Sequence, residues 1–196
     1  MFFPRRSSAI SDVRTALVVG ITALILATAC TPTTETSTAD EGDTAGPEIS
    51  DEDFAFATVD RVVDGDTVSL IIDGSEERVR LIGIDAPESV DRNSPIHCYG
   101  PEASTALKEL LPEGTEVYVL RDVEARDRYD RLLLYIYRSS DDLFVNEWLV
   151  SEGYAEARGY RPNTTLQPIL TEARDDAVEN GRGLWGVCDG PEQPLE

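Results

Sequence analysis

Hydrophobic and polar positions divide the chain into three parts. Residues 16–29 form a predominantly apolar run, residues 31–53 contain almost nothing that a core would bury, and globular patterning begins at Phe54. The middle part carries eight acidic and no basic residues, a composition that predicts a disordered tether. We therefore place a tether at 30–53, one folded domain at 54–190 and a short flexible tail at 191–196.

Five segments of the domain are rich in apolar and β-branched residues and indicate strands. The dipeptide Asp73-Gly74 separates the second from the third and is a strong signal for a two-residue hairpin turn. The expected strands span 57–63, 67–72, 77–84, 115–121 and 132–138.

Apolar residues at helical spacing indicate three helices. The first begins at Gly100 and ends before Pro112. The second is a short helix that we expect Asp141 or Asp142 to cap, and the third spans about 165–180. The order β-β-β-α-β-α-α predicts an α+β domain, a five-stranded Greek-key barrel of the OB type with three packed helices.

The N-terminal residues 1–29 have the features of an export signal. Three arginines precede the apolar run, whose 14 residues are fewer than the roughly 20 that a spanning helix needs. Small residues directly before Cys30 resemble a bacterial lipobox, after which Cys30 would carry a lipid and anchor the protein to the membrane. Ala27 stands where that motif usually has Leu. The alternative is ordinary cleavage after Ala29, which would release a secreted protein.

The two cysteines of the domain are Cys98 and Cys188. Export to an oxidising compartment favours a disulfide between them, and two free thiols are the alternative. In the chain-entropy account, a loop of about 90 residues closed in this way contributes roughly 4–5 kcal/mol.

Charge limits the classes of partner. The chain has 38 acidic against 17 basic residues, a net charge of −21, and residues 54–190 alone carry −13. Such a surface repels polyanions at long range, less so at high salt, and we take the acidity as a sign of a saline habitat. One histidine and three cysteines argue against a zinc site built from nitrogen and sulfur ligands.

Two carboxylate clusters flank the predicted hairpin. Asp64-Gly-Asp66-Thr67 precedes it and Asp85-Ala-Pro-Glu88 follows it, so the hairpin brings Asp66 and Asp85 to the same end of the sheet. Arg80 lies in the returning strand. Carboxylates and a guanidinium together suit a hard cation and a phosphate. Taken singly, the first cluster is more typical of a hairpin turn, and the second is more typical of a strand exit that Pro87 ends.

Six motifs between about Ala57 and Trp185 occur in an order and spacing that resemble those of the staphylococcal nuclease (thermonuclease) family. The resemblance implies an OB-fold, calcium-dependent phosphodiesterase, an endonuclease that hydrolyses DNA and/or RNA and leaves 3′-phosphates. The motifs are Val63-Asp-Gly-Asp66-Thr67, Arg80-Leu-Ile-Gly-Ile-Asp85-Ala-Pro-Glu88, Tyr99-Gly-Pro-Glu-Ala103, Asp127-Arg-Tyr129-Asp-Arg131, Val145-Asn146-Glu and Tyr160-Arg-Pro162-Asn163.

The same resemblance assigns roles by position. Asp66 and Asp85 would ligate Ca²⁺ through their carboxylates, and Ala86 through its backbone carbonyl. Glu88 would act near the metal through a water molecule, as general base or by positioning that water.

Four further residues would face the substrate. Arg80 and Arg131 would bind the scissile phosphate, and Tyr129 and Tyr160 would help to hold the nucleotide. A cation and two guanidinium groups would stabilise the charge that builds on the phosphate oxygens during hydrolysis.

Two positions depart from the best-known member of the family. Asp130 stands beside Arg131 where that member has Gly, so its carboxylate would orient Arg131 or partly neutralise it. Arg158 replaces a Tyr that binds nucleotide there, which favours phosphate contact over base stacking.

Three functional hypotheses follow. The first is an exported, membrane-anchored or secreted nuclease, monomeric, with DNA and/or RNA as substrate and Ca²⁺ as cofactor. The second is a catalytically silent nuclease-like OB module that binds nucleic acid or protein at the cell surface. The third is a structural calcium-binding lipoprotein, a hypothesis that does not explain why Arg80 and Arg131 accompany the carboxylates.

Overall fold

The computed structural model describes residues 54–89, 95–188, 190–191 and 193–194. The export signal at 1–29, the lipidation site Cys30 and the tether at 30–53 lie outside the described residues. Among those described, no helix combines the length and the hydropathy of a membrane span.

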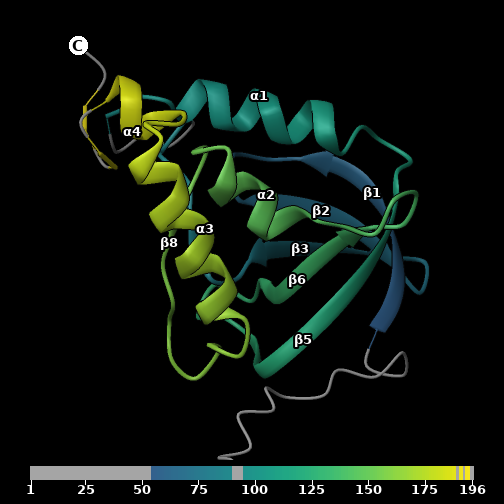
Figure 1. Cartoon of the computed structure of the whole chain (residues 1–196). Helices are drawn as coiled ribbons and strands as arrows, with labels where there is room; N and C mark the ends of the chain where they lie inside the picture. The colour runs from purple at the N-terminus through teal and green to yellow at the C-terminus, as the bar shows by residue number, and fades with distance from the viewer. Residues whose placement is uncertain (1–53, 90–94, 189, 192, 195–196) are drawn as a thin grey trace, which may run out of the picture. The chain divides into compact units, whose positions relative to one another are not determined.

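A closed barrel of five strands forms the domain (Figure 1). The strand order β3-β2-β1-β5-β6 is closed by a parallel pairing between β3 and β6, and the short β7 extends β6 at one edge. This architecture confirms the predicted five-stranded barrel of the OB type. The strands of this sheet are β1 (Phe54–Val62), β2 (Thr67–Ile72), β3 (Ser75–Leu81), β5 (Glu116–Arg126), β6 (Leu132–Arg138) and β7 (Leu143–Phe144).

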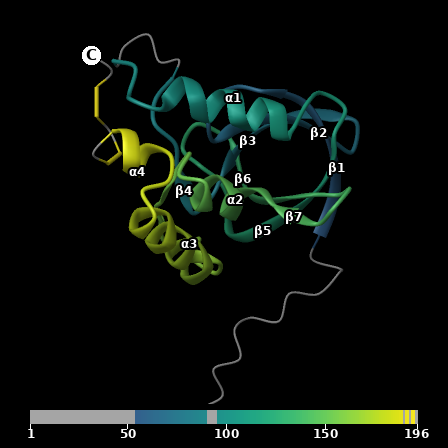
Figure 2. The same ribbon diagram turned by 45° about the horizontal axis from the view of Figure 1, so that its top comes forward.

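Helices lie on the outside of the barrel, with α1 running along one side and α3 beside α2 (Figures 1 and 2). The three predicted helices are present, and the structure adds a single turn, α4, near the C-terminus. The helices are α1 (Gly100–Leu110), α2 (Val145–Ser151), α3 (Gln167–Glu179) and α4 (Leu184–Val187).

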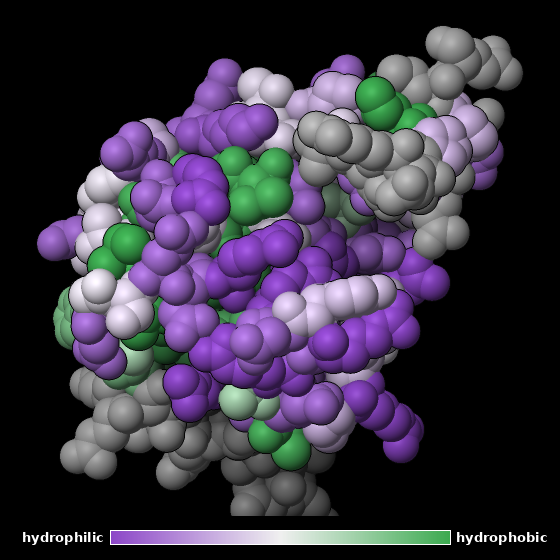
Figure 3. Space-filling model, turned by 180° about the vertical axis from the view of Figure 1, so that it is seen from behind, coloured by the Kyte–Doolittle hydropathy of each residue, from purple (hydrophilic) through white to green (hydrophobic). Residues whose placement is uncertain are grey.

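Alternating apolar residues of the strands fill the barrel and meet residues from the helices. Burying each leucine or valine side chain contributes about 1.5–3 kcal/mol, so this shared core joins the helices to the barrel. The fully buried members include Val68, Leu70, Val79, Leu81, Val117, Ile136, Leu107, Leu149 and Leu170. On the face shown in Figure 3, the described residues form a mostly hydrophilic surface with small separate apolar groups.

The predicted end of the third strand is wrong. The strand expected at 77–84 ends at Leu81, because Gly83 adopts a φ of 79° and turns the chain. The chain then continues as β4 (Ile84–Asp85), which pairs in a separate two-stranded sheet with β8 (Glu156–Ala157). The break therefore moves Asp85 out of the barrel sheet.

The predicted caps of the second helix are also wrong. Its N-cap is Phe144, with no side-chain cap. Asp142 instead occupies a turn before β7, with a φ of 57°, and Asp141 accepts a hydrogen bond from Arg138 at 2.6 Å. The short strand β7 therefore lies between these two residues and the start of the helix.

Candidate active site

The β2–β3 hairpin places Asp66 beside Arg80. Its turn is at Asp73-Gly74, as predicted, with Ile72 paired to Ser75. That register sets Thr67 opposite Arg80, and the backbone carbonyl of Asp66 accepts a hydrogen bond from Leu81 N–H at 2.9 Å. The carboxylate before β2 and the guanidinium near the end of β3 therefore meet at one end of the hairpin.

Arg80 connects the two predicted carboxylate ligands. Its Nη1 forms an ion pair with Asp66 and its Nη2 donates to Asp85 Oδ1 at 2.6 Å. Asp66 is only 3% exposed, and its Oδ2 also accepts a hydrogen bond from the backbone N–H of Ala86 at 2.9 Å. The predicted ligand residues are thus adjacent: Asp66 directly precedes β2, whereas Asp85 and Ala86 are consecutive residues at the end of β4.

Asp66 and Asp85, called the acidic pair from here on, have the chemistry that a hard cation prefers. Both carboxylates contact the same guanidinium, and they offer the oxygen ligands that such a cation prefers. No group of three or more His, Cys, Asp or Glu side chains in the described part of the chain is arranged to hold a metal. A cation here would therefore complete its coordination with backbone carbonyls, water or substrate.

Asp64 is a third carboxylate at this end of the hairpin, which the assignment of roles by sequence omitted. Its Oδ1 accepts a hydrogen bond from the backbone N–H of Asp66 at 3.1 Å. Burial raises the pKa of Asp64. The hydrogen bond with Thr67 and the charges of Arg80 and Arg131 act to lower this pKa, but burial outweighs them. The position of Asp64 in the motif was visible in the sequence, but its closeness to both arginines depends on the fold.

Arg131 is held by a turn that begins at Asp127. Asp127 Oδ2 accepts a hydrogen bond from Arg131 Nε at 2.7 Å, and its Oδ1 accepts from the backbone N–H groups of Tyr129 and Arg131 at 2.9 and 3.0 Å. Asp130 forms its ion pair with Arg126 at 3.7 Å. The expectation that Asp130 orients Arg131 is therefore wrong, and Asp127 has that position.

An open pocket of about 400 Å³ joins these elements. Four of the residues predicted to contact substrate line it together: Arg80 and Arg131 on its wall, and Tyr129 and Tyr160 with exposed rings at 63% and 57%. The guanidinium of Arg131 lies 5.5 Å from the centre of the Tyr129 ring. Two additional arginines, Arg128 and Arg161, contribute to the lining.

The pocket is locally positive within an acidic domain. Four arginines line it against Glu124 and Asp127, the latter already paired with Arg131. Asn163 fixes one wall, because its side-chain amide bonds both backbone groups of Glu124 at 2.7 and 2.9 Å. Among the side chains that line the pocket, arginines therefore outnumber carboxylates, although Arg80 also pairs with Asp66 and Asp85.

Glu88 follows Ala86 by two residues but is not among the residues that line the pocket. Its backbone carbonyl accepts a hydrogen bond from His97 N–H at 2.9 Å, and Gly100 approaches that carbonyl so closely that a side chain there would collide with it. The segment that carries Glu88 therefore packs against the start of α1.

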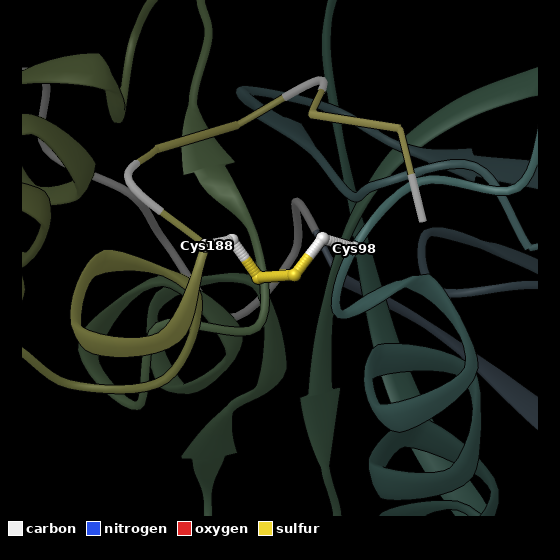
Figure 4. The surroundings of a disulfide bond; sticks show 2 residues. All are labelled: Cys98 and Cys188. Carbon is white, nitrogen blue, oxygen red and sulfur yellow. A yellow bond between two sulfur atoms is a disulfide. The ribbon is translucent and has the colours of Figure 1, made fainter. Parts of the chain in front are cut away.

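The predicted disulfide between Cys98 and Cys188 is present, with the Cα atoms 5.9 Å apart (Figure 4). It joins the segment after Glu88 to the end of α4. Cys98 N–H also donates to Gln193 at 2.7 Å, and His97 forms a β-bridge with Pro194, so the described part of the predicted tail contacts the same segment.

Fold and site together define a class: a small OB-type barrel in which one end of a hairpin joins two carboxylates to a pocket lined by arginines. Comparison with known sequences then identifies the family. The family model described as "Staphylococcal nuclease homologue" matches residues 78–187. This chain belongs to the staphylococcal nuclease family.

Relatives in that family include named nucleases. The chain is 39% identical over 127 residues to the thermonuclease of Staphylococcus intermedius, which covers 65% of this chain and 74% of that one. It is 38% identical over 125 residues to the thermonuclease of Staphylococcus hyicus, covering 64% and 72%. It is 41% identical over 129 residues to endonuclease YncB of Bacillus subtilis, covering 65% and 60%. These relationships support a nuclease function.

Proposed function

We propose that this protein is a calcium-dependent endonuclease that hydrolyses phosphodiester bonds of DNA and/or RNA outside the cytoplasm. The observation that carries the proposal is the position of Arg80. This side chain contacts both Asp66 and Asp85, and it also lines the pocket with Arg131. A cation between the carboxylates and a phosphate in the pocket would therefore be neighbours, as metal-assisted hydrolysis requires.

Arg80 and Arg131 are the groups that bind the scissile phosphate in this proposal. Charge spreads over the non-bridging oxygens as the bond breaks, and preorganised guanidinium groups stabilise it. Arginine suits the role because it stays charged and offers a planar pair of donors. Asp127 holds Arg131 in position, so that side chain is oriented before the substrate arrives.

Asp66 and Asp85, with the backbone carbonyl of Ala86, are the residues that would hold Ca²⁺. The ion would supply positive charge next to the phosphate and to the attacking water. The near-complete burial of Asp66 and its hydrogen bond from Ala86 keep one carboxylate in a fixed orientation for that ion.

Glu88 is the proposed general base, acting on the attacking water or positioning it. Its support is its place two residues after Ala86, on a segment whose backbone is held by His97 and by the nearby disulfide. Tyr129 and Tyr160 would hold the nucleotide, because both expose a ring at the edge of the pocket. By its resemblance to the family, the enzyme would leave 3′-phosphates.

Hydrolysis of DNA and RNA by the purified protein tests the proposal. We would compare Ca²⁺, Mg²⁺ and a chelator, and the variant Arg131→Gln with Arg174→Gln as its matched control. Arg174 pairs with Asp175 on α3, outside the pocket. We expect Ca²⁺-dependent cleavage that Arg131→Gln reduces by about 100-fold or more and Arg174→Gln leaves unchanged. Ligation of a 5′-phosphorylated adaptor to the 3′ ends of the products only after phosphatase treatment would identify the 3′-phosphate.

Two outcomes would change the assignment. A folded protein that binds Ca²⁺ but cleaves nothing at any salt concentration would be the silent module. Cleavage that neither chelator nor Arg131→Gln affects would be consistent with the fold, but it would show that the active site is assigned to the wrong residues.

We further propose that the protein is an exported monomer, anchored to the cell membrane through a lipid on Cys30. The support is the basic and apolar character of residues 1–29 and the small residues before Cys30. Metabolic labelling with a radioactive fatty acid tests the anchor, and Cys30→Ala should abolish labelling and move the protein from the membrane fraction to the medium. An unlabelled wild-type protein in the medium would instead indicate ordinary secretion.

A further inference from the structure

A row of aromatic residues crosses the barrel sheet over four neighbouring strands. Phe56 on β1 pairs with Tyr118 on β5, Tyr118 pairs with Tyr137 on β6, and Tyr137 pairs with Phe144 on β7. Residues directly opposite each other on antiparallel strands share a face of the sheet, so these rings lie side by side. Phe54 precedes Phe56 by two residues and belongs to the same face.

This row lies on the outer face of the barrel. The residues on either side of Tyr118 in β5 are buried inside, so Tyr118 itself points outwards. At one end of the row Phe144 is 9% exposed and stacks on Tyr137 with the ring centres 4.6 Å apart. At the other end Phe56 is 69% exposed. An apolar surface patch of this kind commonly marks a binding site.

The rings border an open hollow of about 530 Å³, called the aromatic hollow from here on, which is lined by Phe54, Phe56, Tyr118, Tyr137 and Asp142. The ring of Phe54 meets those of Tyr118 and Tyr137 at steep angles of 76° and 82°. Phe56 is tilted by 56° against Tyr118. Rings in different orientations therefore border one small volume, whose size is typical of a small-molecule site.

Negative charge accompanies these rings. Among the described residues that line the aromatic hollow, Asp142 is the one that carries a charge. Its neighbour Asp141 pairs with Arg138, whereas Asp142 forms no ion pair with any described residue. Burial raises the pKa of the Tyr137 hydroxyl, and the charge of Glu147 acts in the same direction, so a second carboxylate is close. This environment favours a cation over an anion.

We propose that the aromatic hollow binds a small organic cation that carries a quaternary ammonium group. The faces of aromatic rings are partially negative, so they attract a cation that is placed over them. A trimethylammonium group suits this site, because its methyl groups contact the rings and its charge needs no hydrogen-bond acceptor. Asp142 would balance that charge at the rim.

The geometry distinguishes this ligand from others that aromatic residues bind. A nucleic-acid base or a sugar stacks flat on a ring, whereas the rings around the aromatic hollow cross at steep angles. The phosphates of a nucleic acid would also meet the charge of Asp142. The aromatic hollow shares no lining residue with the pocket that contains Arg80 and Arg131, so the inference does not rest on the nuclease function.

An NMR titration of the purified protein, followed through carbon–proton correlation spectra of its aromatic rings, tests the site. The probes are choline and its neutral isostere 3,3-dimethylbutanol, in which carbon replaces the charged nitrogen. Sodium chloride keeps the ionic strength constant throughout. We expect choline to cause saturable shifts of the Phe56, Tyr118 and Tyr137 rings, and we expect the isostere to bind about tenfold more weakly.

Two variants separate the contribution of the rings from that of the charge. Phe56→Leu keeps an apolar side chain but removes a ring face, so choline should bind about fivefold more weakly while DNA hydrolysis is unchanged. Asp142→Asn removes only the charge, and choline should bind about threefold more weakly. Asparagine tolerates the left-handed backbone that Asp142 adopts, with a φ of 57°, so the turn is kept.

Each variant has a matched control, and far-UV circular dichroism verifies folding. Val123→Ala changes a similarly exposed residue of β5 that does not line the aromatic hollow. Asp73→Asn changes another aspartate with a positive φ, in the turn between β2 and β3. Both controls should bind choline as the wild type does.

Vesicle flotation distinguishes the source of the quaternary ammonium group. Phosphatidylcholine vesicles that carry the wild type upwards, but not Phe56→Leu, would identify a lipid headgroup, provided that phosphatidylglycerol vesicles show no such difference. Binding of choline without this difference would identify a free solute. Either result supports the proposed site.

Three results would overturn the inference. The first is the absence of saturable ring shifts, or an affinity for choline that Phe56→Leu leaves unchanged. The second is equal affinity for choline and its neutral isostere, which would make the aromatic hollow a merely apolar patch. The third is a dimer in analytical ultracentrifugation that Phe56→Leu dissociates and choline does not, which would assign the aromatic hollow to a second copy of the chain. The hydrolysis assay tests the nuclease function separately.

Discussion

The carboxylate of Asp127 lies 2.7 Å from Nε of Arg131 and also accepts a hydrogen bond from the backbone N–H of the same residue. One side chain therefore fixes both the turn and the guanidinium that it presents. Because this carboxylate pairs with Arg131, we expect it to affect the reaction through the orientation of that side chain.

Replacing Asp127 with Asn should impair catalysis without removing any group that contacts the substrate. Loss of the charged partner lets Arg131 leave its orientation, and a misplacement of about 1 Å can cost up to 100-fold in rate. We expect kcat to fall about 10- to 100-fold, measured by steady-state hydrolysis of DNA. In an Arg131→Gln background the same substitution should cause almost no further loss. Independent, multiplying effects of the two substitutions would contradict the coupling.

The interaction between Asp127 and Arg131 should also make the stability of the protein depend on pH. Burial acts to raise the pKa of Asp127, but hydrogen bonds from the backbone and guanidinium of Arg131 outweigh it and hold the pKa below its usual value. A carboxyl whose folded pKa is depressed stabilises the protein above its unfolded pKa of about 3.9, and this contribution is lost as the pH falls through the folded pKa. Between pH 5 and pH 3, the free energy of unfolding measured in urea should therefore change less for Asp127→Asn than for the wild type. Asp175→Asn, on the exposed surface of α3, controls for loss of one carboxylate. A titration of Asp127 above 3.9 by NMR would contradict the expectation.

Removing Arg80 should destabilise the fold as well as abolish activity. Asp66 is 3% exposed, and Arg80→Gln removes the guanidinium that balances the negative charge of Asp66. Breaking one side of a buried ion pair typically costs about 3–5 kcal/mol in the free energy of unfolding, which urea denaturation measures. The double variant Arg80→Gln with Asp66→Asn should recover much of that loss, because the uncompensated charge is gone. A cost below about 1 kcal/mol for Arg80→Gln would show that water or other donors satisfy Asp66.

Asn146 connects α2 to the barrel through the backbone. Its side chain is completely buried, accepts a hydrogen bond from Ile136 N–H at 3.0 Å and donates to the carbonyl of Ile82 at 2.9 Å. Asn146→Ala leaves two buried backbone groups without partners, so we expect about 2–4 kcal/mol of destabilisation in urea. Asn180→Ala is the matched control, because Asn180 is exposed and bonds within its own helix end. Equal effects of the two substitutions would rule out the connecting role of Asn146.

Loss of the disulfide should affect both stability and rate. The double variant Cys98→Ser with Cys188→Ser removes a cross-link between residues 90 positions apart, for which about 2–4 kcal/mol of stability is typical. Because Cys98 follows the segment that carries Glu88, we also expect a lower kcat at a temperature where the variant is fully folded. Reducing agent should lower the stability of the wild type and leave the double variant unaffected. If reducing agent lowered the stability of both proteins equally, its target would be something other than this disulfide.

The sequence by itself predicted the barrel, its three main helices and a hairpin flanked by two carboxylate clusters. Local patterns suffice for these features, because the hairpin turn at Asp73-Gly74 and the alternation of apolar residues act over a few positions. The cysteine pairing was also predictable, since the domain has only Cys98 and Cys188 to join. Resemblance to a family then ordered the motifs into one site.

Only the tertiary structure decided which of those charged groups pair with one another. Gly83 ends β3 early and lets Asp85 meet β8, so the contact between Asp85 and Arg158 joins residues 73 positions apart. The choice of Asp127 over Asp130 as the partner of Arg131 likewise depends on where a turn directs each carboxylate. Charges interact through space at distances of a few ångströms, and the chain order of acidic and basic residues does not encode those distances.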